Sequence, residues 1–168
     1  MINYAPLSNR DQNLLSLRKA LQEDVPIIAQ FNVAMALETE DKTLDPEVLR
    51  SGVRRMQADA SLGFYLVALR NNEVAGCLGV TFEWSDWRDG LFWWIQSVFV
   101  DPSHRGCGVF TALYRDTERL AIATPEVIGL RLYADQDNDR AIRTYHRLGM
   151  RTTEYRLLEV DLRRNKIG

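Results

Sequence analysis

The sequence predicts an α/β (α+β) fold in which helices flank both faces of a mixed central sheet. The first observation is the order of its elements. Apolar runs of strand length and amphipathic helical stretches follow one another as βααβββαβαβ, with a further strand expected at the end. The second observation is composition. Of the 168 residues, 46% are hydrophobic and 26% are charged, which is ordinary for a globular domain with one core.

The first part of the chain predicts a strand and two helices. Acidic residues and a proline stand in the first turn of the first helix, and an Asp-Pro pair starts the second. A polar stretch between the helices predicts a loop. The expected bounds are residues 14–21 for the strand, 23–37 for the first helix and 38–44 for the loop, with the second helix beginning at Asp45.

A hairpin and two longer apolar strands come next. Asn71 and Asn72 separate two runs rich in β-formers, a spacing typical of a tight hairpin turn. The expected strands are residues 64–70, 73–82, 94–100 and 127–134, followed by a short strand near Met150 and a last strand over 155–162.

The strand over 94–100 leads into a glycine loop and then a helix. Gly106 and Gly108 lack a Cβ atom, so their backbone N–H groups can turn toward a ligand. The amphipathic helix that follows the loop has partial positive charge at its N-terminus, and Arg105 adds a full charge. Together these features predict an anion site suited to a pyrophosphate. The alternative is an ordinary turn between a strand and a helix, since short glycine patterns also arise by chance.

A second motif extends from Asn138 to Met150. It predicts a short helix that starts at Asn138 and ends at Gly149, with Ala141 and Tyr145 on one face. The alternative interpretation makes Asn138 only a helix cap and Tyr145 only a packed aromatic side chain with a polar tip.

Together the two motifs resemble the GNAT superfamily of acyl-CoA-dependent N-acetyltransferases, whose loop reads R/Q-x-x-G-x-G/A and whose later helix reads N-x-x-A-x-x-x-Y-x-x-L-G-F. Phe110 departs from the loop pattern, which ends on a small residue. The resemblance implies that the strands over 94–100 and 127–134 run parallel and splay apart, and that pantetheine enters the gap. The residues that it implies for acetyl-CoA binding are Val98, Phe99, Val100, Arg105, Gly106, Cys107, Gly108, Val109, Phe110, Asn138, Ala141 and Tyr145.

The resemblance also implies the chemistry. The acetyl group of acetyl-CoA passes directly to a primary amine, and a bulge in the strand over 94–100 aims a backbone N–H at the thioester carbonyl. Tyr145 matches the family's tyrosine acid, which gives a proton to the departing thiolate. The alternative role of Tyr145 is packing or positioning of the sulfur.

The general base is less defined than the acid. Gln96 stands where diamine-type acetyltransferases carry a glutamate, and an amide cannot accept a proton as a carboxylate does. Glu38 and Glu40 are therefore the first candidates, because the loop between the first two helices borders the acceptor site in this fold. Glu83 and a water are the alternatives.

The acceptor is expected to be a small-molecule or peptide amine. An aromatic cluster over residues 84–94 predicts core packing for most of its members, and an aromatic acceptor cleft or a homodimer surface for the rest. His104 and His146 lack partners at metal-ligand spacing, so no metal is expected. The rival hypothesis is a non-catalytic acyl-CoA-binding sensor or interaction module on the same fold.

The chain is expected to be a single domain over residues 1–168, with a loose lead over 1–12. A net charge of −2 argues against nucleic acid as a partner. The absence of a signal pattern and of an apolar run of transmembrane length favours a cytoplasmic protein without a membrane partner.

Overall fold

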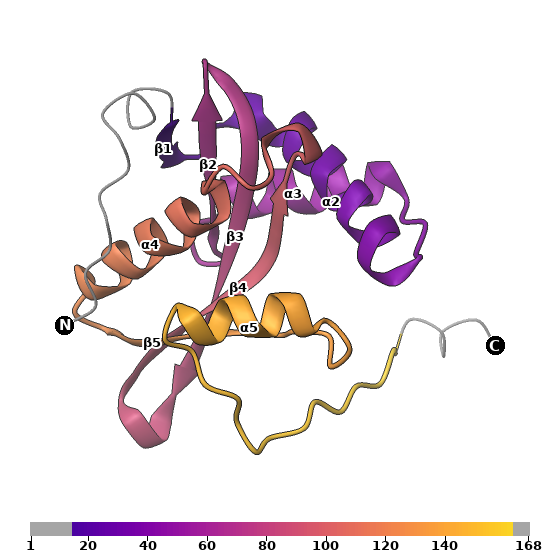
Figure 1. The fold of residues 1–168 in the computed structure, drawn as a ribbon. Coiled ribbons are helices and arrows are strands. Elements are labelled where there is room, and N and C mark those ends of the chain that lie inside the picture. The colour runs from indigo at the N-terminus through magenta and orange to yellow at the C-terminus, as the bar shows by residue number, and fades with distance from the viewer. Residues whose placement is uncertain (1–14, 163–168) are drawn as a thin grey trace. The chain divides into compact units, whose positions relative to one another are not determined.

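Residues 15–162 are described by the computed structural model, in which the chain divides after Tyr133 into two units (Figure 1). The first unit contains the sheet and three of the helices, and the second, from Ala134 onward, contains one helix. The loose lead expected over residues 1–12 lies outside the described residues.

A five-stranded sheet in the order β1-β2-β3-β4-β5 forms the centre of the first unit. Neighbouring strands from β1 to β4 are antiparallel, and β4 and β5 are parallel, so the predicted mixed sheet is confirmed. Asn71 and Asn72 have φ angles of 52° and 65°, the left-handed values that a two-residue hairpin turn requires. The strands are β1 Leu15–Lys19, β2 Phe64–Arg70, β3 Glu73–Ser85, β4 Gly90–Val100 and β5 Val127–Leu132.

The helices of the first unit lie on both faces of this sheet, as the sequence predicts (Figure 1). α2 and α3 pack on one face, where Tyr65, Cys77 and Phe99 contribute to their shared core. α4 packs on the other face through Leu113 and Thr117, which are fully buried. The helices and helical turns are η1 Gln22–Asp24, α2 Val25–Glu40, α3 Pro46–Ala58, η2 Asp86–Arg88, η3 Pro102–His104, α4 Val109–Ile122 and, in the second unit, α5 Asp139–Arg147.

The start of α4 approaches the sheet closely at Gly76. A Cβ atom on Gly76 would lie 2.7 Å from the carbonyl oxygen of Phe99 and 3.2 Å from Cγ1 of Val109. A side chain at position 76 would therefore collide with the backbone of β4 and press against the first residue of α4. This close packing sets where the helix N-terminus lies relative to the end of β4.

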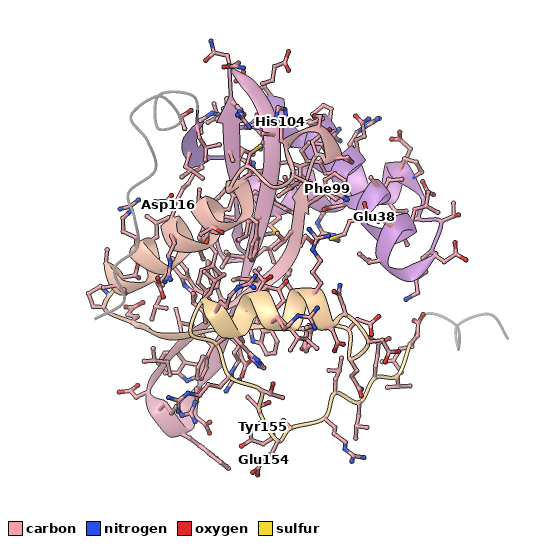
Figure 2. The ribbon with its side chains drawn as sticks, in the orientation of Figure 1. Glu38, Phe99, His104, Asp116, Glu154 and Tyr155 are labelled. Atoms are coloured by element: carbon pink, nitrogen blue, oxygen red, sulfur yellow. The ribbon has the colours of Figure 1, made fainter. Side chains whose placement is uncertain are left out.

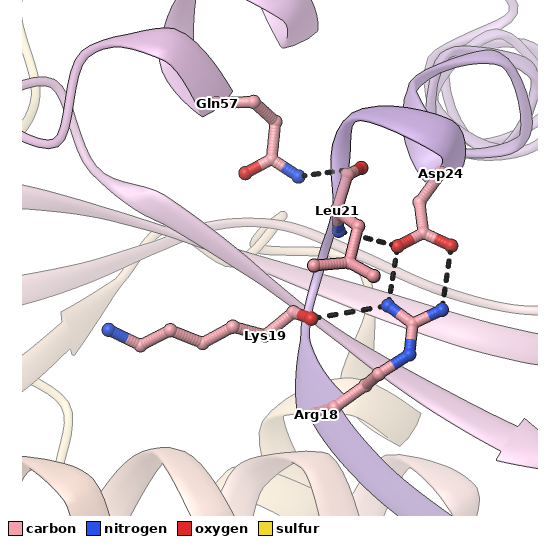
Figure 3. A network of polar contacts seen from close by, with 5 residues as sticks. All are labelled: Arg18, Lys19, Leu21, Asp24 and Gln57. Carbon is pink, nitrogen blue, oxygen red and sulfur yellow. Dashed lines mark hydrogen bonds and ion pairs between the residues drawn. The ribbon is translucent and has the colours of Figure 1, made fainter.

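A partly buried ion pair fixes the start of α2 (Figure 3). The side chain of Arg18 donates to both carboxylate oxygens of Asp24, at 2.6 and 3.0 Å, and the N–H of Leu21 donates to the same carboxylate at 2.6 Å. Burial by itself would raise the pKa of Asp24, but these hydrogen bonds and the positive charge of Arg18 hold it below its usual value. The pair therefore ties the end of β1 to the helix that leads toward the candidate site.

The loop expected over residues 38–44 is wrong at its start, because α2 continues to Glu40. Glutamate favours helix, and the hydroxyl of Thr39 donates to the carbonyl oxygen of Met35 at 2.8 Å, within the helix. The helix ends where Asp41 takes a left-handed conformation with φ of 50°. Glu38 and Glu40 thus belong to the last helical turn, not to a loop.

The strand boundaries also differ from those expected. β3 extends three residues further, to Ser85, and β4 begins four residues earlier, at Gly90, because the antiparallel pairing continues to Ser85 opposite Gly90. β5 ends at Leu132 rather than at residue 134. Cross-strand pairing, which residue patterns specify poorly, decides these lengths.

The parallel strands separate part of the way along β4. The pairing of β4 with β5 ends at Ile95 opposite Leu132, whereas β4 pairs with β3 as far as Val100. The register of β3 against β4 also shifts, so that Gln96 is an extra residue on β4. The splayed pair and the bulge that the resemblance implies are both present.

The second unit consists of α5 and an irregular segment. The side chain of Asn138 accepts from the N–H of Ala141 at 3.0 Å, and Gly149 follows the helix with φ of 96°. The strands expected near Met150 and over 155–162 are wrong, because residues 151–162 form no strand in the described part of the chain. Their alternating apolar pattern supplies the side chains of a strand but not the neighbouring backbone that a ladder needs.

Candidate active site

The edge of β4 that faces away from β3 carries the first feature of the site. The N–H of Asp101 donates to the carbonyl oxygen of Ala75 at 2.9 Å, so the backbone groups of every second residue before Asp101, beginning with Phe99, bond to β3. Because hydrogen-bonded and non-hydrogen-bonded residues alternate, the backbone groups of Val98 and Val100 point toward the opposite edge. That edge is the one from which β5 has separated, so its donors and acceptors are placed to pair with an extended ligand.

A pocket of about 200 Å³ lies against this edge. One wall comes from β4, one from the last turns of α2, and one from the loop and first turn that lead into α4. Glu38 on α2 and Phe99 on β4 lie on the same side of the sheet (Figure 2). The lining residues are Met35, Glu38, Thr39, Val98, Phe99, Val100, Arg105 and Phe110.

The glycine loop adopts the conformation that the sequence predicts. Gly106 and Gly108 have φ angles of 76° and 78°, in the left-handed region that favours glycine. The first bond of α4 runs from the N–H of Ala112 to the carbonyl oxygen of Gly108, at 2.9 Å. The N–H groups in the first turn of a helix point out along its axis, and Gly108 has no side chain that could cap the start of α4. The loop can therefore present several N–H groups to an anion.

Arg105 lies between this loop and the end of α2. Its Nη1 and Nη2 atoms donate to the two carboxylate oxygens of Glu38, both at 2.7 Å. Its Nε donates to the carbonyl oxygen of Val100 at 3.0 Å, and its Cζ lies 5.5 Å from the centroid of the Phe99 ring. The sequence interpretation missed this ion pair, because 67 positions separate the partners and no local pattern connects them.

The pairing changes the acid–base character of Glu38. The hydrogen bonds and positive charge of Arg105 lower the pKa of this carboxyl, although partial burial acts in the opposite direction. A carboxylate held in this way takes up a proton less readily than an unpaired one. Glu40 ends the same helix, but its side chain lies outside the described part of the structure.

Phe110 takes the place of the small residue in the loop pattern. Its side chain is half-buried in the first turn of α4, lines the pocket, and has its ring centroid 6.3 Å from that of Tyr114. An aromatic ring at this point fills space that alanine or glycine leaves open. Phe110 therefore shapes the wall of the pocket where α4 begins.

The bulge on β4 is surrounded by polar side chains. The amide of Gln96 donates to the hydroxyl of Thr81 at 2.9 Å, on the neighbouring strand. The amide of Asn32 donates to the hydroxyl of Tyr65 at 3.2 Å, and the Tyr65 hydroxyl is also hydrogen-bonded to Ser97. Burial raises the pKa of Tyr65, so its hydroxyl stays protonated at neutral pH. These contacts hold the bulge against β3 and α2, and the sequence interpretation did not identify Asn32 or Tyr65.

Glu83, the alternative base, is engaged in a network of its own. One carboxylate oxygen accepts from Nε1 of Trp94 and the other from Nη1 of Arg131, at 2.6 Å in the second case. Cζ of Arg131 lies 3.6 Å from the centroid of the Phe92 ring, and the rings of Trp94 and Tyr133 are 4.4 Å apart. Arg131 was missed by the sequence interpretation, which read its segment only as an apolar strand.

The aromatic cluster over residues 84–94 divides between core and surface. Trp93 is buried and meets the ring of Phe64 edge-on at 5.1 Å, so it belongs to the core. Trp84 and Trp87 are exposed, the second by 91%. The hypothesis of an aromatic acceptor cleft therefore applies to Trp94 and these two exposed side chains, and it stays a prediction.

The residues predicted from the second motif share helix α5. Asn138 acts as its N-cap through the hydrogen bond to the N–H of Ala141, which is the structural alternative considered from the sequence. Its contact with the cofactor stays a prediction. Burial raises the pKa of Tyr145, so its hydroxyl carries a proton at neutral pH.

Metal-ligating groups, cysteines and long apolar helices are the remaining features of residues 15–162. Within this range, no three side chains of His, Cys, Asp or Glu come together in a way that could hold a metal ion. Cys107 in the loop is exposed, and Cys77 is buried, which raises its pKa to about 12. In the same range no helix is both long enough and apolar enough to cross a membrane.

Comparison with known proteins supports one family. The model of the acetyltransferase (GNAT) family matches residues 31–150. A protein from Clostridium difficile 630, described as a possible acetyltransferase, is 38% identical with a TM-score of 0.84, and the match covers 89% of this chain and 98% of that one. No curated protein matches the chain.

Two more distant structures share the fold alone. An aminoglycoside acetyltransferase, meta-AAC0020, from an uncultured soil metagenomic sample and in complex with sisomicin, is 19% identical with a TM-score of 0.67, covering 89% of this chain and 96% of that one. An acetyltransferase of Trypanosoma brucei is 22% identical with a TM-score of 0.65, covering 88% and 99%. The family model spans well over half of the 168 residues, and the matched range includes β4, the glycine loop and β5. The chain belongs to the GNAT family of acetyltransferases.

Proposed function

We propose that this GNAT protein is an acetyl-CoA-dependent N-acetyltransferase that transfers the acetyl group directly to a primary amine of a small molecule or peptide. The observation that carries the proposal is the pocket, because it joins the free edge of β4 to the glycine loop and Arg105. A strand edge suits the amide-rich pantetheine arm, and a helix N-terminus with an arginine suits phosphates. These are the two halves of coenzyme A.

The residues present fit this cosubstrate. Val98 offers its backbone N–H and C=O, and Val100 its N–H, to the pantetheine amides, while the carbonyl of Val100 accepts from Nε of Arg105. Phe99 anchors the strand in the core between them. The N–H groups from Gly106 through Val109 face the diphosphate, with Cys107 and Phe110 beside them. Acetyl-CoA supplies an activated acetyl group as a thioester. The bulge at Gln96 provides a backbone N–H for the oxyanion that forms as the amine attacks.

Tyr145 is the proposed proton donor to the departing thiolate. Because its pKa is raised, the hydroxyl is protonated at neutral pH and can donate this proton to the sulfur as the carbon–sulfur bond breaks. Asn138 and Ala141 present the start of the same helix to the cofactor arm in this proposal.

Glu38 and Glu40 remain the proposed bases for the amine. The pairing with Arg105 weakens the case for Glu38, whose pKa is lowered, and thus favours Glu40 or a water. Glu83 accepts hydrogen bonds from both Trp94 and Arg131, which suits it better to structural support than to proton uptake.

The acceptor carries a primary amine in this proposal. The chain is also proposed to be a single domain over 1–168 that acts in the cytoplasm, without nucleic acid, membrane or metal as a partner. Small polyamines, amino-acid amides, short peptides and aminoglycosides such as sisomicin form the panel to test. Sisomicin is included because it is bound by one structure of the same fold. Size-exclusion chromatography with light scattering will show whether the chain forms a homodimer.

The second candidate function is a non-catalytic acyl-CoA-binding module. Phe110 in the pocket wall and the amide of Gln96 in place of a carboxylate favour it. Such a module would bind CoA and show no turnover on any amine.

The deciding experiment measures CoA release and acetylated product over the amine panel, for the wild type and for Tyr145→Phe. Turnover by the wild type is expected, with a decrease of roughly 10²–10⁴-fold in the variant if proton donation is fully used. CoA binding and thermal stability should stay nearly unchanged in Tyr145→Phe. CoA binding without product on the whole panel would favour the second candidate. Full activity of Tyr145→Phe would limit Tyr145 to packing.

A further inference from the structure

We propose that Glu38 is an internal ligand of Arg105, whose carboxylate occupies the guanidinium edge that a phosphate of CoA uses, so that CoA binding displaces it. This inference rests on the proposed function, since it assumes that CoA enters the pocket. Of the two proposed bases, it assigns Glu38 to the control of cofactor affinity and leaves proton transfer to Glu40 or a water.

The geometry of the pair supports a shared binding edge. Nη1 and Nη2 of Arg105 each lie 2.7 Å from one oxygen of Glu38, the parallel two-bond arrangement that guanidinium forms with carboxylates. A phosphate presents two oxygens to guanidinium in the same way. A carboxylate and a phosphate cannot hold this one edge together, so they exclude each other.

The two partners are not equally held in place. Arg105 has two further contacts, from Nε to the carbonyl oxygen of Val100 at 3.0 Å and from Cζ to the ring of Phe99 at 5.5 Å. These contacts fix the plane of the guanidinium at the wall of the pocket, whichever group its Nη atoms bind. Glu38 lies in the last turn of α2 with its side chain 49% exposed. Its side chain can rotate into solvent, and Arg105 then stays where a phosphate meets it.

The exchange takes place inside the pocket, because Glu38, Phe99, Val100 and Arg105 all line it. An ion pair exposed to this degree contributes little free energy, so displacement lowers CoA affinity modestly rather than abolishing it. Removing the charge of Glu38 should therefore strengthen CoA binding by about 2- to 5-fold.

The test is isothermal titration of CoA into the wild type, Glu38→Gln, Arg105→Ala and the double variant. Glu38→Gln keeps the shape of the side chain and removes its charge, and it should bind CoA about 2- to 5-fold more tightly. In the Arg105→Ala background the same change should have no effect, because no guanidinium is left to release. Glu118→Gln is the matched control, since Glu118 also pairs with an arginine, at 2.6 Å, on α4 outside the pocket, and it should bind like the wild type.

A second ligand separates the phosphates from the rest of the cofactor. Pantetheine, which has no diphosphate, should bind Glu38→Gln and the wild type equally in a titration followed by NMR. Equal or weaker CoA binding by a folded Glu38→Gln, with Glu38→Ala giving the same result, overturns the inference while leaving the proposed function intact. Tighter pantetheine binding would also overturn it. A wild type that does not bind CoA contradicts the proposed function and this inference together.

Discussion

Two glutamate–arginine pairs join distant parts of the chain, Glu38 with Arg105 and Glu83 with Arg131. Their partners are 67 and 48 positions apart, and each arginine lies over a phenylalanine ring, at 5.5 and 3.6 Å respectively. The first pair connects the end of a helix to a loop beside the pocket. The second connects β3 to β5, the two strands on either side of β4.

Under the exchange proposed above, the same pair of residue types has a structural role in one place and a displaceable one in the other. Backbone ladders hold both ends of the Glu83–Arg131 pair, and Trp94 shares its carboxylate, so the pair is part of the sheet. Only side-chain contacts join the Glu38–Arg105 pair across the pocket, and its carboxylate is half-exposed. Charged groups that must meet a ligand need a partner that is weak enough to leave.

The partly buried pair of Arg18 and Asp24 gives the structural limit of this comparison. Asp24→Asn should lower the free energy of unfolding by about 2 kcal/mol, because it weakens charge-assisted hydrogen bonds at a carboxylate that is 5% exposed, while the Arg18 side chain, 33% exposed, keeps part of its hydration. Urea denaturation followed by circular dichroism measures this. Glu47→Gln, which breaks an exposed pair with Arg50, is the control and should cost less than about 0.5 kcal/mol.

The same residue predicts a dependence on pH. The pKa of Asp24 is lower in the folded chain than its ordinary value of 3.8. Its stabilising contribution is therefore present above that value and is lost as the pH falls below it, through the folded pKa. Denaturation at pH 7 and pH 3 should show a smaller loss in Asp24→Asn than in the wild type. An equal loss would mean that Asp24 does not contribute to acid sensitivity.

On the exchanging side of the comparison, the loop backbone should matter at least as much as the arginine. Gly108→Val should weaken CoA binding by roughly 2–3 kcal/mol, because a β-branched residue is strained at φ of 78° and its side chain stands where the ligand approaches. No atom lies within 4 Å of a Cβ built on Gly108, so the effect comes from conformation and not from a clash. Gly108→Asn is the control, since asparagine tolerates this conformation, and it should bind CoA more tightly than the valine variant.

Arg105→Ala should weaken CoA binding by roughly 1.5–3 kcal/mol, the scale of a charge-assisted hydrogen bond. The free energy of unfolding should change by less than about 1 kcal/mol, because the pair with Glu38 is partly exposed. Calorimetric titration and urea denaturation give the two numbers. If the variant loses stability and keeps its affinity for CoA, the Glu38–Arg105 pair is structural, like the Glu83–Arg131 pair, and the contrast between the two pairs is wrong.

The smallest effect is expected at Arg131, and it should fall on stability alone. Arg131→Ala removes the stacking on Phe92 and one hydrogen bond to Glu83, and should destabilise the fold by about 1 kcal/mol. CoA affinity should match that of the wild type. Arg119→Ala, which breaks a pair with Asp116 on α4 in which the arginine is 66% exposed, is the control and should change CoA affinity not at all and stability by less than about 0.5 kcal/mol. A decrease in CoA affinity for Arg131→Ala would place both pairs in the cofactor site.

Local patterns in the sequence determined most of the elements and the glycine loop. The turn at Asn71 and Asn72, the cap at Asn138 and the left-handed residues Gly106 and Gly108 depend on backbone preferences of neighbouring residues, which a sequence displays directly. The splayed strands and the bulge came from the resemblance to a family rather than from residue spacing.

Only the tertiary structure decided the lengths of β3 and β4, the end of α2 and the partners of the charged residues. Strand length depends on which backbone lies alongside, so the apolar alternation over 155–162 predicted a strand where the described structure has none. The partner of Arg105 is a glutamate 67 positions away, brought near by the packing of α2 against β4. A charged residue has no defined orientation or neighbour until the chain folds. For this reason the sequence predicted Arg105 as an anion-binding residue but did not predict its ion pair with Glu38.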